Sequence, residues 1–171
     1  MKAEASKFAK EWEDMGMHYM LVVCTCVFVL MGCGGKTDAQ LIKESSDAVT
    51  KELSKKYKPG ECQKWLYMES AGAIKSGASK LVCDSEFNVD KGLIFTDTKI
   101  YRHDDYIAVC GKVSGFTDLG EISANYIYTD NSDHRVSIQK SKSSLSMNDE
   151  NNRKLEKLSA DLFALEMRSC K

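Results

Sequence analysis

The chain has 171 residues, of which 29% are charged and 43% are hydrophobic. This length fits one domain of ordinary size with an appendage, and the composition is that of a globular rather than a disordered protein. From Gly34 onward the sequence contains 21 Lys and Arg against 21 Asp and Glu. A balance so close to neutral excludes a basic field for nucleic acid, so we expect no nucleic-acid partner.

The first distinctive feature is an uncharged run from Gly16 to Gly35, which is most apolar over residues 20–31. As a helix, these twelve residues would be about 18 Å long, whereas a bilayer core is roughly 30 Å thick. The run is therefore short for a membrane span. It matches the apolar core of an export signal, which is roughly 7 to 15 residues long and is followed by small residues.

The run ends in Leu30-Met-Gly-Cys33, which resembles the lipobox of bacterial lipoprotein precursors. The resemblance implies that residues 1–32 are a removable signal peptide and that Cys33 receives the lipid. Residues 33–36 would then start the lipid-anchored chain and residues 37–171 would form one globular domain. Two or three acyl chains, palmitate among them, hold a protein at a membrane far better than one. By the same resemblance, Gly34 after the cysteine implies an outer-membrane destination, with the domain facing the periplasm.

Two alternatives to this interpretation remain open. Residues 1–16 carry three lysines and four acidic residues, whereas an export signal begins with positive charge. Translation from Met15, Met17 or Met20 would remove all four acidic residues. Otherwise residues 17–35 are an uncleaved signal anchor, and the chain is a single-span accessory subunit of an envelope assembly. A buried helix of a cytosolic domain ranks third, because no polar face interrupts residues 20–31.

After Cys33 the pattern predicts helices. Residues 37–57 place apolar side chains near one helical face and charged ones opposite, and Thr37 and Gln40 have the spacing of a capping box. Pro59-Gly60 ends this helix. A second helix is predicted over residues 61–78, although two glycines interrupt it.

Beyond Lys80 the sequence favours strands. A short apolar run occupies residues 81–83, and runs rich in β-branched and aromatic residues follow. These runs cover residues 92–101, 105–116, 121–129 and 134–140. Four such strands at hairpin spacing predict an antiparallel meander.

The last element is a helix that Ser146 and Asp149 can cap. Its leucines recur at spacings of three and four, and Phe163 and Met167 widen the apolar stripe. We expect this stripe, made by Leu155, Leu158, Leu162 and Leu165, to cover the sheet. The predicted fold class is α+β, with N-terminal helices, a four-stranded antiparallel meander and a C-terminal helix packed on the sheet.

Four cysteines remain after the lipidated residue: Cys62, Cys83, Cys110 and Cys170. In an exported protein an even number indicates two disulfides, for which three pairings exist. We favour Cys62 with Cys83, which closes a short loop, and Cys110 with Cys170, which pins the last helix to a strand. Reduced thiols in a cytosolic protein are the alternative. No CxxC motif follows Cys33, so we expect no metal site.

The segment from Val109 to Ser114, VCGKVS, resembles a pattern found in small bacterial and phage-borne lipoproteins. The resemblance implies no activity. The two histidines that lie near carboxylates are His103 and His134, which could bind a metal or exchange protons if they met in space. Both lie where turns are predicted, and such residues are usually solvated turn formers.

No motif for a nucleophile elbow, a phosphate loop or a zinc helix occurs in the chain. We therefore expect no enzymatic activity and no cofactor. The leading hypothesis is a small envelope lipoprotein that binds another envelope protein or has a structural role. An envelope enzyme or metal-binding protein using His103 or His134 is the alternative from another class.

Overall fold

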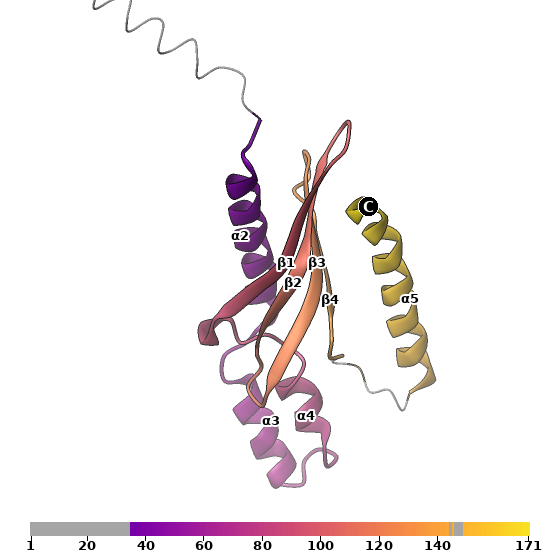
Figure 1. The fold of residues 1–171 in the computed structure, drawn as a ribbon. Coiled ribbons are helices and arrows are strands. Elements are labelled where there is room, and N and C mark those ends of the chain that lie inside the picture. The colour runs from indigo at the N-terminus through magenta and orange to yellow at the C-terminus, as the bar shows by residue number, and fades with distance from the viewer. Residues whose placement is uncertain (1–34, 144, 146–148) are drawn as a thin grey trace, which may run out of the picture. The chain divides into compact units, whose positions relative to one another are not determined.

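The computed structural model describes residues 35–143, 145 and 149–171, and Cys33 with the apolar run lies outside this part. Residues Asp38–Lys171 form one compact unit. The fold is α+β, as predicted, with helices before and after one sheet (Figure 1). Its elements in chain order are α2 (Asp38–Lys56), α3 (Glu61–Ser70), α4 (Ala78–Cys83), η1 (Val89–Lys91), β1 (Leu93–Arg102), β2 (Ile107–Phe116), β3 (Glu121–Asp130), β4 (Val136–Lys140), α5 (Glu150–Glu166) and η2 (Met167–Cys170).

The sheet is the predicted antiparallel meander, with strand order β1-β2-β3-β4. Each strand pairs with the next one along the chain, so only short turns connect them. The register of β1 shifts between Thr96 and Lys99, where Asp97 has a φ of 56°. This bulge interrupts the regular outer edge of β1, a common way for edge strands to avoid pairing with another chain.

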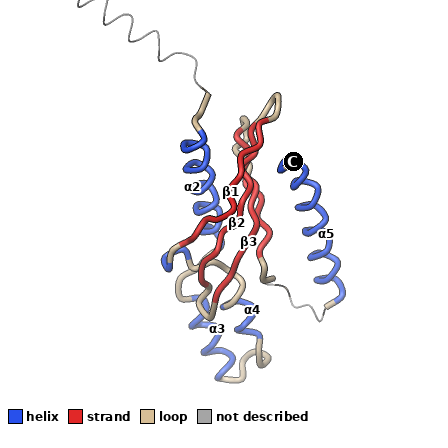
Figure 2. The backbone as a smooth tube through the Cα atoms, viewed as in Figure 1, coloured by secondary structure: helices blue, strands red, loops and turns tan. Residues whose placement is uncertain are grey.

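One face of the sheet packs against α2 (Figure 2). Side chains alternate between the faces of a strand, so Val109, Tyr126 and Tyr128 point the same way across β2 and β3. Helix α2 meets them with an apolar stripe at helical spacing. The main core cluster on this side consists of Val49, Leu53, Phe87, Val113, Ile122, Ala124 and Tyr126.

The opposite face packs against α5 and η2 through a smaller cluster. Ala108, Cys110 and Ile127 come from the strands, and Phe163 and Cys170 come from the C-terminal helices. Figure 1 accordingly shows the sheet between α2 and α5. The C-terminal helix is packed on the sheet as predicted, at its C-terminal end.

The face of α5 that meets the sheet differs from the predicted one. The four leucines that we expected to cover the sheet are 51% to 56% exposed, whereas Phe163 is only 7% exposed. Successive helical residues are about 100° apart, so turning Phe163 inward directs Leu162 away. The disulfide between Cys110 and Cys170 attaches η2 to β2, and this attachment fixes how α5 is rotated against the sheet.

Between α2 and the sheet, the predicted helix over residues 61–78 and the predicted strand over residues 81–83 are both wrong. The second helix ends at Ser70 rather than near residue 78, and Gly72 follows with a φ of 72°. Residues 81–83, predicted as a strand, form the end of α4. Glu69 explains why α4 forms as a separate helix. Its carboxylate accepts hydrogen bonds from the backbone N–H groups of Gly77 at 2.7 Å and Ser79 at 2.9 Å, at the start of α4. Such caps satisfy donors at a helix start.

The two disulfides have the predicted pairing. Cys62 joins Cys83 with their Cα atoms 4.8 Å apart, which links α3 to α4. Cys110 joins Cys170 with their Cα atoms 6.1 Å apart, which links β2 to η2. Both Cα separations lie in the usual range for disulfides. The part of the chain that is described is thus a disulfide-braced domain.

Candidate functional site

A cavity of about 200 Å³ lies where the end of α2, the α3–α4 pair and the turn between β2 and β3 meet. Pro59-Gly60 starts the turn that leads α2 into α3, and the disulfide of Cys62 and Cys83 holds the two short helices together. The cavity is lined by Lys56, Tyr57, Lys58, Glu61, Cys62, Val82, Cys83, Ser85, Glu86 and Asp118. Polar side chains converge on this cavity, which makes it a candidate site.

Tyr57, Asn88 and Asp118 form a hydrogen-bonded triangle beside this cavity. The Tyr57 hydroxyl donates to Asp118 Oδ1 at 3.0 Å, and Asn88 Nδ2 donates to both the Tyr57 oxygen at 2.7 Å and Asp118 Oδ1 at 2.8 Å. Desolvation by burial raises the pKa of Tyr57, and the hydrogen bond to Asp118 adds to this effect. The tyrosine therefore stays protonated and serves as a donor.

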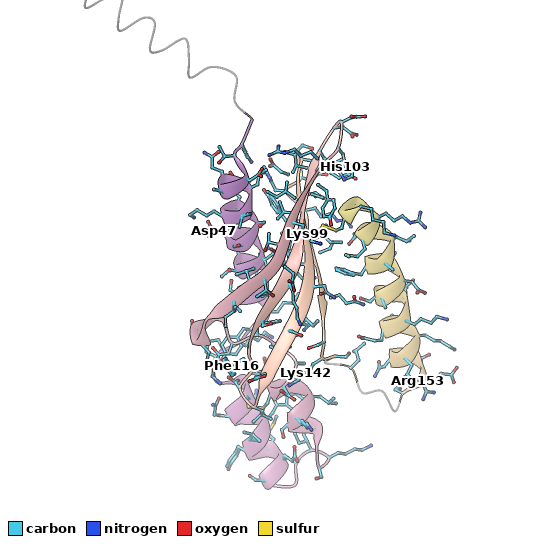
Figure 3. The ribbon with its side chains drawn as sticks, in the orientation of Figure 1. Asp47, Lys99, His103, Phe116, Lys142 and Arg153 are labelled. Carbon is cyan, nitrogen blue, oxygen red and sulfur yellow. A yellow bond between two sulfur atoms is a disulfide. The ribbon has the colours of Figure 1, made fainter. Side chains whose placement is uncertain are left out.

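Asp84 is the centre of a second group of contacts. Its Oδ1 accepts hydrogen bonds from Thr117 Oγ1 at 2.9 Å and from Lys142 Nζ at 2.5 Å. Desolvation by burial would raise its pKa, but these hydrogen bonds and the nearby positive charges of Lys142 and Lys80 lower it. Figure 3 shows Lys142 at the end of the sheet near α3 and α4. Asp84 is therefore a carboxylate that ties three separate segments together.

The loop between α4 and η1 contains polar atoms without partners. Glu86 Oε1 pairs with Lys140 Nζ at 2.5 Å. Within the part of the chain that is described, however, Ser85 Oγ, Glu86 Oε2 and Asn88 Oδ1 are buried and make no hydrogen bond. Such an atom costs about 1–3 kcal/mol. Residues 85–88 are thus the least satisfied part of the described core.

The polar groups of this site are mainly carboxylates whose oxygens already accept hydrogen bonds from neighbouring side chains. Asp84, Glu86 and Asp118 each accept hydrogen bonds from side chains of the same domain. Among the described residues, no lining serine or cysteine is hydrogen-bonded to a histidine, because His103 and His134 do not line the cavity and Cys62 and Cys83 form a disulfide. The cluster fixes the turn between β2 and β3 against the loop after α4. Lys56 and Lys58 add positive charge to the cavity lining.

The two histidines are each engaged locally at the ends of different hairpins. His103 Nε2 lies 3.0 Å from the carbonyl oxygen of Ser169, and its ring stacks on Tyr106 with the centroids 4.4 Å apart. His134 Nδ1 lies 3.1 Å from the Tyr128 hydroxyl and 3.4 Å from Asp130 Oδ1. Within residues 35–143, 145 and 149–171, no group of three or more His, Cys, Asp or Glu could hold a metal ion.

The structure places four of the five candidate cysteines. Cys62, Cys83, Cys110 and Cys170 all form disulfides, whereas Cys33 lies outside the described residues. Among the helices that the structure does describe, none combines the length and the apolar character that a bilayer crossing requires. The polar contacts of Asp84 and of Tyr57 were missed, since they join residues as far apart in the chain as 58 positions (Asp84 and Lys142) and 61 positions (Tyr57 and Asp118) and share no motif.

Two apolar surfaces remain exposed on the side of the sheet that α5 and η2 cover in part. Ile94 and Phe116 are 64% and 43% exposed, and they line an open hollow of about 500 Å³ with Lys112, Glu121 and several serines. Figure 3 shows Phe116 toward the end of the sheet near α3 and α4, away from His103. The second surface is the row of exposed leucines on α5. Both are candidate contact surfaces.

Comparison of this chain with known proteins finds no matching family model, no matching curated protein and no matching solved structure.

Proposed function

We propose that this protein is a bacterial envelope lipoprotein, anchored through Cys33, whose disulfide-braced domain binds another envelope component or has a structural role. The observation that carries the proposal is the pairing of all four cysteines after Cys33 into two disulfides. Disulfides form and persist in oxidising spaces outside the cytosol. A chain with such a domain needs an export signal, which the lipobox-like leader supplies.

The arrangement of polar groups supports a binding or structural role rather than catalysis. The carboxylates near the α2–α3 turn are held by side chains of the same domain, and both histidines contact their own hairpins or η2. Groups held in this way stabilise loops. The exposed apolar surfaces of the sheet and of α5 instead provide area for contact with another molecule.

The test is metabolic labelling of cells with palmitate. We expect label on the wild-type chain, no label on Cys33→Ala, and accumulation of that variant with residues 1–32 still attached. Cys24→Ala is the matched control, because it removes a thiol from the same apolar run. It should leave labelling unchanged. Label that survives in Cys33→Ala would refute the lipid site. An unlabelled wild type that keeps residues 1–32 would refute the lipoprotein and leave the two uncleaved alternatives, the single-span anchor and the cytosolic domain.

A further inference from the structure

Charged residues of both signs line the cavity at the end of α2: Lys56, Lys58, Glu61, Glu86 and Asp118. One carboxylate among them is already matched, since Glu86 Oε1 lies 2.5 Å from Lys140 Nζ. Two ammonium groups, from Lys56 and Lys58, and two carboxylates, from Glu61 and Asp118, are left around the cavity.

These four charges do not pair with one another. In the part of the chain that the structure describes, none of the four side chains makes an ion pair. The carboxylate of Asp118 accepts hydrogen bonds there from two neutral side chains, those of Tyr57 and Asn88, and both reach Oδ1. An ion pair brings nitrogen and oxygen within about 4 Å. The opposite charges around this cavity therefore stand farther apart than that.

The backbone that carries these charges is held in place. Lys58 and Glu61 stand at the two ends of the Pro59-Gly60 turn, which a 3.2 Å hydrogen bond from the Glu61 N–H to the Lys58 carbonyl closes. Asp118 is tied to α4, because its N–H donates to the carbonyl oxygen of Cys83 at 3.2 Å, and the disulfide of Cys83 joins α4 to α3. Figure 1 shows α3 and α4 at the end of the sheet where β2 turns into β3. The site is therefore preorganised.

We propose that this cavity binds a small zwitterion, an amino acid or a dipeptide, whose carboxylate pairs with the two lysines and whose ammonium group pairs with Glu61 and Asp118. A ligand with one sign of charge would pair with half of the charged lining and be repelled by the other half. A zwitterion matches both halves. Val82 and the disulfide in the lining add an apolar wall for a small side chain.

The size of the cavity limits the ligand. Pockets for drug-sized molecules measure roughly 300–1,000 Å³, whereas this cavity measures about 200 Å³. The ligand is therefore smaller than a drug-sized molecule, a condition that a dipeptide with small side chains meets. Lys56 and Lys58 are both exposed, so a ligand reaches this side of the cavity from solvent. All four charged residues belong to the disulfide-braced domain, so the site does not depend on a lipid at Cys33.

The test titrates L-alanyl-L-alanine into the chain, purified in the mature form that its cells produce, and ligand-observed NMR gives the Kd. Two blocked forms of the same dipeptide are compared with it. The N-acetylated form lacks the ammonium group, and the C-terminal amide lacks the carboxylate. We expect the free dipeptide to bind about tenfold tighter than either blocked form, because each block removes a charge-assisted hydrogen bond.

Two variants assign the two ends of the ligand. Glu61→Gln should weaken binding of the free dipeptide several-fold and change the acetylated form little, because that form has no ammonium group. Lys58→Gln should weaken the free dipeptide and change the amide little, because the amide has no carboxylate. Lys64→Gln is the matched control, since Lys64 is an exposed lysine of α3 outside the cavity lining. Each variant must keep its two disulfides, as shown by mobility without reductant, so that a folding failure is recognised.

Three results would each overturn the proposal: no binding of the free dipeptide, equal binding of the free and blocked forms, or losses in Lys64→Gln as large as those in the two cavity variants. The failure of this inference is distinguishable from that of the lipid anchor, because palmitate labelling reports on Cys33 alone. Dipeptide binding to an unlabelled chain would retain the cavity site and remove the anchor. A labelled chain that binds no dipeptide would do the reverse.

Discussion

Gly111 in β2 lies directly opposite Tyr126 in β3, and the ring of Tyr126 covers it. A Cβ atom added at this glycine would lie 2.6 Å from the Tyr126 hydroxyl oxygen and 2.8 Å from Cζ. Tyr126 is fully buried and its hydroxyl lies 3.1 Å from Thr98 Oγ1, so the ring cannot move without loss. The residue is glycine because the core needs this space.

We predict that Gly111→Ala lowers the free energy of unfolding by about 1–3 kcal/mol through overpacking. Gly120→Ala is the matched control, because its nearest atoms would lie at 3.7 Å, an ordinary contact. Unfolding in urea, followed by tyrosine and tryptophan fluorescence, gives both values. Equal stability of the two variants would contradict the packing of Tyr126 over β2.

Asp84 should make the stability of the domain depend on pH in the acidic range. Burial alone would raise its pKa, but the hydrogen bonds from Lys142 and Thr117 bring it below its ordinary value. A carboxyl whose folded pKa is lowered adds stability that is present above its unfolded pKa and is lost as the pH falls through its folded pKa. Asp84→Asn should therefore cost roughly 1–2 kcal/mol at pH 7.

The difference between wild type and Asp84→Asn should shrink as the pH falls below about 4. Denaturant unfolding at a series of pH values measures it. Asp47→Asn provides the control, since this carboxylate pairs with Lys43 on the exposed surface of α2. Such surface pairs contribute little. A pH-independent cost at Asp84 would show that its charge is not what stabilises the loop.

At the scale of the element, α5 is held to the sheet by few side chains. Phe163→Ala should cost about 3–5 kcal/mol, because a buried aromatic ring is removed from the contact with Ala108 and Ile127. Leu158→Ala should stay within about 0.5 kcal/mol of wild type, since Leu158 is exposed and alanine favours helix. Urea unfolding gives the free energy of unfolding of both variants. The reverse order would mean that the leucines face the sheet.

The two disulfides should stabilise the domain unequally. They close loops with sequence separations of 21 and 60 residues, for which loop entropy gives about 3 and about 4 kcal/mol. Replacing Cys62 and Cys83 by serine should therefore cost less than replacing Cys110 and Cys170. Only the second change should accelerate hydrogen exchange throughout α5. Uniform exchange in both double variants would argue that η2 is not the anchor of this helix.

The strands could be predicted from the sequence because alternation and turn residues are local signals. β3 is an example, as Ile122, Ala124 and Tyr126 alternate with Ser123 and Asn125 and a DNSD turn follows. The prediction of a strand over residues 81–83 was wrong because three apolar residues fit a strand or a helix equally well. The outcome depends on Glu69, which caps α4 from eight to ten residues earlier in the chain. Periodicity does not report such a contact.

The orientation of α5 and the polar cluster show a second limit. Leucines at spacings of three and four predict that a helix has an apolar face, but not which partner covers it. Here the disulfide at Cys170 and the bulk of Phe163 decide the rotation. Likewise, Tyr57 and Asp118 meet only because the β2–β3 turn reaches the end of α2. Apart from the cysteine pairs, such contacts between distant segments cannot be predicted from local patterns in the sequence.

At the scale of the whole molecule, the disulfides and the proposed lipid anchor both require export from the cytosol. The proposed function places this domain, braced by two disulfides, in an oxidising space, where such bonds form and persist. A lipid on Cys33 would hold it there at the end of a four-residue tether. With so short a tether, the domain would stay close to the membrane. The account therefore predicts one mature form of the chain.

The intact mass of the chain extracted from membranes, recorded before and after reduction, tests this account most directly. The account predicts that residues 1–32 are missing, that Cys33 carries acyl groups, and that reduction adds four hydrogens for the two disulfides. A full-length chain without acyl groups, whose mass does not change on reduction because all seven cysteines are free thiols, would contradict it.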